Sequence, residues 1–276
     1  MLTELVSILV TLVGTGLYNL QRWLRNLSVR GITPRKALRL FVQRCRLKSE
    51  IRFSASVLLL LRSNTNDDLF LLIQGGSQER RYWSPVGGVL KFFPSRVLNR
   101  HRELQVTLDR NAGLGDGLVD DIRLLLPGRQ AFKFLRWFNT DQGRESIDQA
   151  MIREMYEELR PMGDELNDES RDLENELLHL LPVIGFEEAF PEPIVEIGRG
   201  PVFAGGSEEF FNVRLFYVVN VVREAEFQQW IEKALDNYLG SRCRWVLSGE
   251  IRALSIVDTV RIGGHSRALF GELPGA

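Results

Sequence analysis

Cysteine and histidine are both scarce in this sequence. Its two cysteines, Cys45 and Cys243, are too few for a disulfide framework, and neither has a partner at the spacing of a metal site. The three histidines are scattered and form no H-x-x-x-H pattern or Cys/His cluster, so zinc chemistry has little support. These absences argue against a disulfide-stapled secreted scaffold and favour a reducing, cytosolic setting for the main body.

A strong overall charge is also lacking, although the charge is unevenly placed. The net charge is -1, but residues 1–52 contain ten Lys and Arg against two acids, which leaves -9 on the remainder. With 44% hydrophobic and 26% charged residues, the 276-residue chain has an ordinary globular composition and can bury a full core. The basic residues lack interleaved aromatics and a base-reading motif, so nucleic acid is not an expected partner.

The N-terminal segment is the one long stretch without charge. Residues 5–21 contain no charged side chain. As a helix these residues would span about 26 Å, near the roughly 30 Å of a bilayer core. We expect a single transmembrane helix over residues 1–26. A cleaved signal peptide and a surface-lying helix are the alternatives, but a positive n-region and an A-x-A-like site are missing.

A basic stretch follows the uncharged segment. Residues 27–50 place apolar positions among Arg and Lys, which predicts a juxtamembrane helix drawn to anionic lipid. The basic excess after residues 1–26 puts the body of the chain in the cytoplasm by the positive-inside tendency. Ser7, Thr11 and Thr15 form a small-residue face through which helices can associate, so a homo-oligomer stands beside ordinary tolerance of small residues.

A cluster of acids marks the middle of the chain. Glu154, Glu157 and Glu158 fall within about a 100° arc of an expected helix. The apolar face of that helix carries Met151, Met155 and Leu159. Like charges three and four positions apart repel by a few tenths of a kcal/mol per pair. A divalent cation with carboxylate ligands, Mg²⁺ or Mn²⁺, would relieve this repulsion, and a plainly solvated acidic face is the alternative.

Two features accompany the acidic helix. Glu145 lies eight residues before Arg153, about two turns along the same side, in a turn that leads into the helix. Farther upstream, residues 83–88 (Trp-Ser-Pro-Val-Gly-Gly) follow a strand-like region and form a turn in which backbone can approach a ligand closely.

Together these residues resemble the Nudix hydrolase signature, G-x5-E-x7-R-E-U-x-E-E-x-G-U, where U is a bulky aliphatic residue. From Glu145 to Glu158 every spacing of the signature is intact. Two places depart from it. Asn139 stands where the first glycine belongs, and Arg160 and Pro161 replace the last glycine and aliphatic residue.

The first departure is explained by an insertion. Gly87-Gly88 and residues 143–146 look like two halves of the signature turn, separated by an insertion at about 91–142. At the other end, Pro161 can still stop the helix. The resemblance implies an α/β fold, a Nudix α/β/α sandwich with a mixed sheet, over residues 51–276.

The resemblance also implies roles for individual residues. The acids that would hold Mg²⁺ or Mn²⁺ are Glu154, Glu157 and Glu158. The catalytic set would comprise Glu145, Arg153, Glu154 and Glu157, with Glu145 and Arg153 as an orienting pair. The substrate side would be lined by Gly87, Gly88 and Trp83. Trp83 or Tyr82 would stack on a base, unless it is simply a core aromatic.

The implied reaction is attack of water on the diphosphate of a nucleoside diphosphate derivative. The layout is similar to membrane-anchored Nudix effectors associated with bacterial CD-NTases in antiphage defence. That similarity implies a cyclic nucleotide activator and a single-pass protein of the bacterial inner membrane with a cytoplasmic catalytic domain. The alternative is a Nudix-fold sensor that binds a nucleotide without hydrolysis and acts through assembly of its membrane helices.

Periodicity predicts the remaining elements. Residues 51–62 and 69–74 are expected to form a hairpin, and residues 121–126 and 132–137 a second hairpin within the insertion. Later strands are expected at 181–186, 210–222 and 245–247, with an amphipathic helix at 225–239. The acidic stretch 164–176 is expected to be a solvated helix or loop rather than a second metal site.

Overall fold

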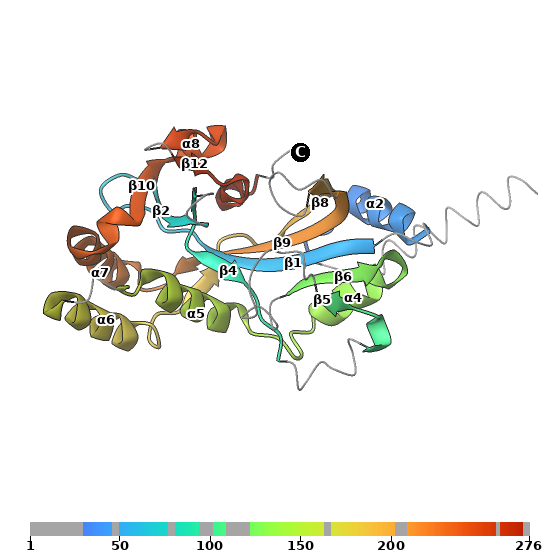
Figure 1. Ribbon diagram of the computed structural model, residues 1–276, viewed down its shortest axis with the longest axis horizontal. Helices are drawn as coiled ribbons and strands as arrows, with labels where there is room; N and C mark the ends of the chain where they lie inside the picture. Colours follow the sequence, from blue (N-terminus) through green and yellow to red (C-terminus); the bar gives the residue numbers. More distant parts are fainter. Residues whose placement is uncertain are drawn as a thin grey trace, which may run out of the picture.

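Figure 1 shows the computed structural model of the chain. The structure describes residues 30–45, 50–76, 81–93, 102–108, 122–162, 167–201, 209–257 and 260–272. The expected transmembrane helix at 1–26 lies outside these ranges and stays a prediction. Within the described ranges, none of the helices combines the length and the apolar character needed to span a bilayer.

A large mixed sheet forms the centre of the molecule. Over the described residues it contains seven strands in the order β5-β6-β1-β9-β7, with β4 also beside β1 and β8 also beside β9. The strands are β1 (Glu50–Leu59), β4 (Gly87–Val89), β5 (Thr107–Leu108), β6 (Arg123–Pro127), β7 (Phe186–Glu188), β8 (Ile194–Pro201) and β9 (Glu209–Val221). β1 and β9 run parallel, and the other pairs are antiparallel.

A smaller sheet packs against one end of the large sheet (Figure 1). Its described strands lie in the order β10-β2-β3-β12-β11. Their bounds are β2 (Leu69–Gly75), β3 (Tyr82–Ser84), β10 (Cys243–Leu247), β11 (Ile256–Val257) and β12 (Val260–Ile262). Only β3 and β12 pair in parallel among these described strands.

Side chains of the two long central strands, β1 and β9, alternate between the two faces of the sheet and enter two separate hydrophobic cores. Side chains at odd positions of β1 from Ile51 to Leu59 and of β9 from Val213 to Val221 enter the main core. Leu58, Phe216 and Val218 point the other way, into a second core shared with the smaller sheet. Because successive side chains of a strand face opposite sides, this end of the sheet is apolar on both faces.

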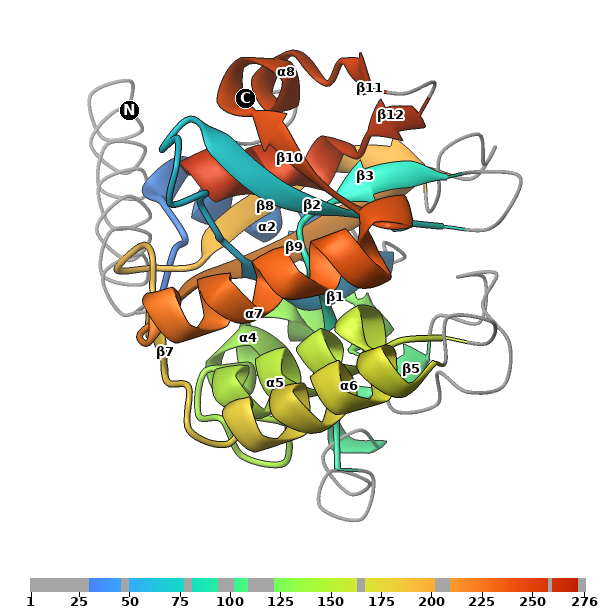
Figure 2. The same ribbon diagram turned by 90° about the vertical axis from the view of Figure 1, so that its left-hand side faces the viewer.

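The helices divide between the two cores. They are α2 (Pro34–Cys45), α4 (Ala131–Phe138), α5 (Ile147–Leu159), α6 (Asp168–Leu180), α7 (Glu224–Asn237) and α8 (Ser248–Ala253), with 3₁₀ turns η3 (Gly128–Gln130), η5 (Leu239–Ser241) and η6 (Gly264–Phe270). Helices α2, α4, α5, α6 and α7 pack into the main core, whereas α8 and η6 pack into the second core. Figure 2 shows α5, α6 and α7 side by side, with the smaller sheet above them. The mixed sheets and flanking helices fit the expected α/β Nudix fold.

The first expected hairpin is only partly correct. β1 and β2 belong to different sheets. They are joined near the turn, where Arg62 bridges Phe70 and the Leu71 N–H donates to the Leu61 carbonyl over 3.0 Å. The chain therefore leaves the large sheet after Leu59 and enters the smaller one, a change of sheet that alternation alone does not reveal.

The second expected hairpin is wrong in its second half. β6 forms as expected, but residues 132–137 belong to helix α4. Phe134 and Phe138 lie four residues apart and both pack on Phe53, whereas the exposed Lys133 and Arg136 lie three apart. This spacing is helical, because a strand would place Phe134 and Arg136 on the same face.

Of the later elements, the strand at 210–222 and the helix at 225–239 are confirmed as β9 and α7. The strand expected at 181–186 does not form. Residues 181–183 form a turn that continues the hydrogen bonding of α6, and strand β7 begins only at Phe186. Leu181 and Ile184 are both buried three positions apart, a spacing that a single strand face does not have. Most of the acidic stretch forms the start of α6.

Candidate active site

Helix α5 carries the acidic cluster and begins at a well-formed cap. The Ser146 hydroxyl accepts the Gln149 N–H, and the Gln149 side chain accepts the Ser146 N–H, each over 3.1 Å. This reciprocal capping box satisfies two backbone donors that a helix start leaves unpaired. The apolar face is buried as expected. Its members are Ala150, Met151, Met155 and Leu159.

The two halves of the split signature meet directly before α5. The Lys91 N–H donates to Glu145 Oε2 over 2.8 Å, and the Glu145 N–H donates to the Lys91 carbonyl over 2.9 Å. The Phe93 N–H reaches the Gly143 carbonyl over 2.8 Å. The chain thus leaves this point after Phe93 and returns to it at Gly143, so the insertion does not separate the glycine turn from the acidic helix.

Arg153 connects these parts through a two-pronged ion pair with Glu145. Its Nε and Nη2 atoms each lie 2.9 Å from a different oxygen of Glu145, and Nη2 also donates to the Val89 carbonyl over 3.0 Å. Nη1 donates to Glu154 Oε1 over 2.5 Å. Burial alone lowers the pKa of Arg153, but its bonds to Glu145 and Glu154 outweigh that effect and raise it.

The glycine turn of β4 fits closely around the acids of α5. A Cβ added to Gly88 would lie 2.2 Å from Glu154 Oε1, so the Glu154 carboxylate occupies the space that a side chain would take. Gly87 has φ +145°, and a Cβ there would lie 2.2 Å from the Val57 carbonyl oxygen. Gly87 therefore requires glycine, whereas a side chain at Gly88 would have to displace the Glu154 carboxylate.

Glu158 is the most perturbed acid of the cluster. Its pKa is raised to about 8, chiefly by burial and additionally by the charges of Glu154 and Glu157. The Gly87 N–H, which donates to Glu158 Oε2 over 2.9 Å, opposes this shift, as does Arg242. Glu157 is more open. Its side chain is 48% exposed, with Lys91 Nζ 3.9 Å from one of its oxygens.

The donor chemistry of this cluster suits a divalent cation. Burial and then the charges of Glu154 and Glu157 raise the pKa of Glu158, and the oxygen atoms of these acids would be ligands for a bound Mg²⁺ or Mn²⁺ that offsets their repulsion. Over the described residues, however, no set of three or more His, Cys, Asp or Glu side chains is gathered as a ready metal site. Glu154 bonds to Arg153 instead.

The C-terminal end of α5 is capped by residues from elsewhere in the chain. Arg242 donates to the carbonyls of Glu158 and Arg160 over 3.1 and 2.8 Å, and the Tyr238 hydroxyl donates to the Leu159 carbonyl over 2.8 Å. These contacts satisfy carbonyls that the missing signature glycine would otherwise help to cap. Sequence reasoning missed Arg242 and Tyr238, because no local pattern links them to a helix about 80 residues away.

Trp83 is a core residue. It is 4% exposed in the second core, and its indole N–H donates to the Val257 carbonyl over 3.0 Å. The neighbouring Tyr82 is 37% exposed and contacts His265 edge-on. Of the two alternatives for Trp83, its burial favours the core aromatic.

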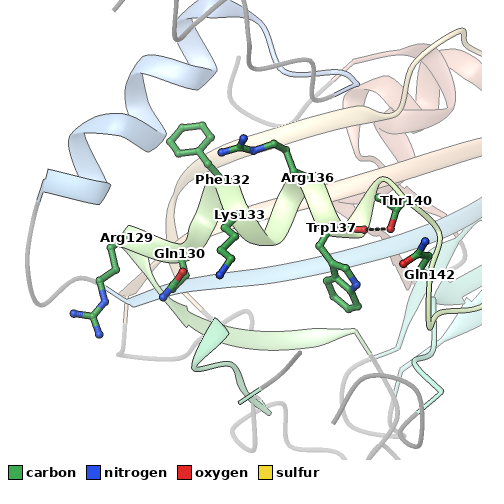
Figure 3. Close-up of a pocket in the computed structure, with 8 residues that line it drawn as sticks. All are labelled: Arg129, Gln130, Phe132, Lys133, Arg136, Trp137, Thr140 and Gln142. Carbon is green, nitrogen blue, oxygen red and sulfur yellow. Dashed lines mark hydrogen bonds between the residues drawn. The ribbon is translucent and has the colours of Figure 1, made fainter. Parts of the chain in front are cut away.

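A separate cavity of about 650 Å³ lies beside α4 (Figure 3). Its lining residues are Arg129, Gln130, Phe132, Lys133, Arg136, Trp137, Thr140 and Gln142. The cations do not converge in Figure 3, and Glu103 and Gln105 bind Lys133 and Arg129. With no acid or thiol in its lining, this cavity is a weaker candidate for catalysis than the α5 cluster.

A mixed-sheet α/β fold in which a glycine turn meets an R-E-x-x-E-E helix defines a Nudix protein. The family model described as SMODS-associated NUDIX domain matches residues 50–270, and the chain belongs to this family. It is thus a Nudix member of the kind associated with CD-NTase systems, and its domain suggests a hydrolase. No curated protein and no solved structure matches the chain.

The fit between Gly88 and Glu154 can be tested by a double-mutant cycle. We expect Gly88→Ala to lower the unfolding free energy by about 1–3 kcal/mol, because its Cβ collides with the carboxylate. In a Glu154→Ala background the same change should cost clearly less. Urea unfolding measures both. Gly249→Ala, which has open space around its Cβ, is the matched control, and equal costs in both backgrounds would contradict the contact.

The raised pKa of Glu158 predicts a pH-dependent stability in EDTA. The folded protein holds this proton up to about pH 8, whereas an unfolded Glu releases it near about 4.3. Stability should therefore fall as pH rises through this window, and Glu158→Gln should lose that part of the fall. Unfolding free energies at several pH values test this. The exposed Glu169→Gln should keep the wild-type slope, and a parallel Glu158→Gln curve would refute the assignment.

Proposed function

We propose that the protein is a membrane-anchored hydrolase that uses Mg²⁺ or Mn²⁺ to cleave a nucleoside diphosphate derivative. The observation that carries the proposal is the crowding of Glu154, Glu157 and Glu158 on α5 beside the Gly87-Gly88 turn. A phosphoryl transfer needs charge neutralisation on the phosphate oxygens and an activated water. A divalent ion held by these acids would supply both.

The roles of the individual residues follow from their contacts. Glu154, Glu157 and Glu158 would contribute the oxygen ligands. Arg153 and Glu145 act behind them, because their ion pair sets where the Glu154 carboxylate lies. In the reaction the water oxygen bonds to phosphorus, the bridging P–O bond breaks, and the water proton passes to a carboxylate of the cluster.

Glu158 is our candidate for the proton acceptor. A general base needs a carboxylate oxygen held within reach of the attacking water. The Gly87 N–H orients one oxygen of this carboxylate. Glu157, the most exposed of the three acids, would meet the metal and substrate from the solvent side.

One observation favours a second candidate, a Nudix-fold sensor that binds a nucleotide without cleaving it and acts through assembly of membrane helices. Among the described side chains, no acid group is preassembled as a metal site, and Glu154 is committed to Arg153. The hydrolase remains our first proposal, because the acids of the signature are all present and lie together.

Hydrolysis can be tested with full-length wild type and Glu157→Gln in Mg²⁺ or Mn²⁺. Each would be incubated with a panel of nucleoside diphosphate derivatives, with and without cyclic oligonucleotides. We expect product release by wild type and a loss of about 100-fold or more in the variant, since Glu157 would be both ligand and substrate contact. The exposed Glu169→Gln on α6 is the control. Equal, low rates for wild type and Glu157→Gln would leave the sensor as the better account.

Membrane anchoring and activation by a cyclic nucleotide are further parts of the proposal. The uncharged residues 5–21 and the basic residues after them support a single-pass anchor in the bacterial inner membrane with the Nudix domain in the cytoplasm. On α2, Leu38 and Val42 are exposed four residues apart, as suits a helix resting on lipid. Membership of a CD-NTase-associated family supports a cyclic nucleotide signal in antiviral defence, and a homo-oligomer would let anchors assemble.

Deleting residues 1–26 tests the anchor. We expect full-length protein in the membrane fraction and the deleted form in the soluble fraction, because the uncharged segment is lost. Full-length protein with Leu38→Asp and Val42→Asp should remain with the membrane, since the span would outweigh the contribution of α2. Unchanged fractionation of the deletion would reject the anchor.

A further inference from the structure

The smaller sheet covers only part of the second face of the large sheet. At one end, Leu58, Phe216 and Val218 are buried against the smaller sheet. At the other end the same face of the central strands carries polar residues, because they alternate with the core positions. These residues are Glu50, Arg52, Ser54 and Ser56 on β1, Arg123 on β6, Asn212 and Arg214 on β9, and Glu196 on β8.

Strand register places two of these arginines on either side of one serine. Ser54 pairs with Arg123 on β6 and with Arg214 on β9. Neighbouring strands lie about 4.8 Å apart, so the two arginine backbones are separated by about 10 Å across Ser54. Arg123, Ser54 and Arg214 are all partly exposed. We call these three residues the arginine row.

Two guanidinium groups of the arginine row lie on this face at partly exposed positions. Arg52 lies on the same face two residues back along β1, but its side chain is buried. Glu196 is the acid that pairs in register with Arg214, and its Oε2 is 3.5 Å from Arg214 Nη1. A guanidinium presents several donors in a planar fork that matches the oxygens of a phosphate. The geometry of Arg123 and Arg214 on either side of Ser54 therefore suits a phosphate-bearing ligand.

Tyr82 and His265 are each close enough to charged residues of these two places for their pKa values to be affected. Burial raises the pKa of Tyr82, the charge of Glu158 raises it further, and Arg123 opposes both. The Tyr82 and His265 rings are in edge contact, with centroids 5.8 Å apart. The pKa of His265 is lowered to about 4, chiefly by burial and additionally by the charge of Arg214. The pKa of Tyr82 therefore depends on the charges of both Glu158 and Arg123, and the pKa of its neighbour His265 depends on the charge of Arg214.

The spacing along β1 relates the row to the reaction centre. Ser54 lies in the row, and Leu58, four residues on, pairs with Gly87, whose N–H holds Glu158. Four strand residues span about 13 Å. This length is on the scale of a nucleotide, so one ligand can contact both places.

We propose that the arginine row binds a second phosphate of the substrate, separate from the diphosphate at the α5 acids. This inference rests on the proposed function and narrows the substrate to a nucleoside diphosphate derivative with a further phosphate at a distance. Arg123 and Arg214 hold that phosphate from both sides of Ser54, and Glu196 competes with it for Arg214.

Binding to full-length protein tests the inference without relying on turnover. The Glu157→Gln background in Mg²⁺ is titrated with two ligand pairs, NAD and NADP, and guanosine 5′-diphosphate and guanosine 3′,5′-bis(diphosphate). Within each pair the second ligand adds phosphate. We expect the added phosphate to tighten binding by about 10-fold or more in at least one pair, with a steeper loss in salt.

Single substitutions in the arginine row then test whether its arginines bind the added phosphate. Arg123→Gln and Arg214→Gln should each lose about 10-fold or more in affinity for the phosphate-rich ligand and little for its partner. Glu196→Gln should change affinity in the opposite direction, because it frees Arg214, and this gain cannot result from misfolding. Arg136→Gln on α4 is the exposed control.

The outcomes separate the two proposals. Equal affinities within both ligand pairs, or row variants that weaken both members of a pair alike, would overturn the arginine row. Loss of preference in Arg214→Gln without any gain in Glu196→Gln would also count against it. Absence of Glu157-dependent hydrolysis, with the phosphate preference intact, would overturn the proposed hydrolase and leave the arginine row standing.

Discussion

The ion pair between Arg153 and Glu145 holds the candidate site together. Glu145 lies on the chain as it returns from the insertion, accepts the Lys91 N–H from the other side of that insertion, and binds two nitrogens of Arg153. Arg153 in turn bonds to the Val89 carbonyl and to Glu154. The pair is mostly buried, so removing one partner would leave the other charge uncompensated. The glycine turn, the two ends of the insertion at Lys91 and Glu145, and α5 are therefore held together.

The acids of α5 are held close together against their own repulsion. Gly88 leaves room for Glu154, the Gly87 N–H binds Glu158, and Arg242 caps the helix end beneath Glu158. Each contact compensates negative charge or the lost hydration of a carboxylate, yet the pKa of Glu158 remains high. A site in this condition favours the binding of a cation, which is the physical basis for our proposal of a metal-dependent hydrolase. The arginine row gives the same molecule a surface of opposite charge nearby.

The sequence correctly predicted those helices and strands whose hydrophobic period is visible within their own residues. Helix α5, its apolar face and strand β9 follow from spacing. The pairing of Glu145 with Arg153 was implied by the resemblance to the Nudix signature, and the structure contains it. The strand expected at 132–137 was wrong, because a short apolar run fits both periods and contact with Phe53 decides between them. The prediction of the first hairpin was only partly correct, because β1 and β2 lie in two different sheets. The role of Arg242 could not be predicted, because it caps a helix that is far away in the sequence and no spacing pattern connects the two.

The sequence by itself determined the family signature, the acidic face of α5 and the uneven charge of the chain. These properties depend on residue types at short separations, where geometry is set by the helix or strand period. The tertiary structure alone decided how the split signature closes, which carboxylate has the raised pKa, that Trp83 is buried, and that Arg123 and Arg214 flank Ser54. Those properties depend on contacts between segments far apart in the chain, and burial and strand register, which set them, exist only in the folded protein.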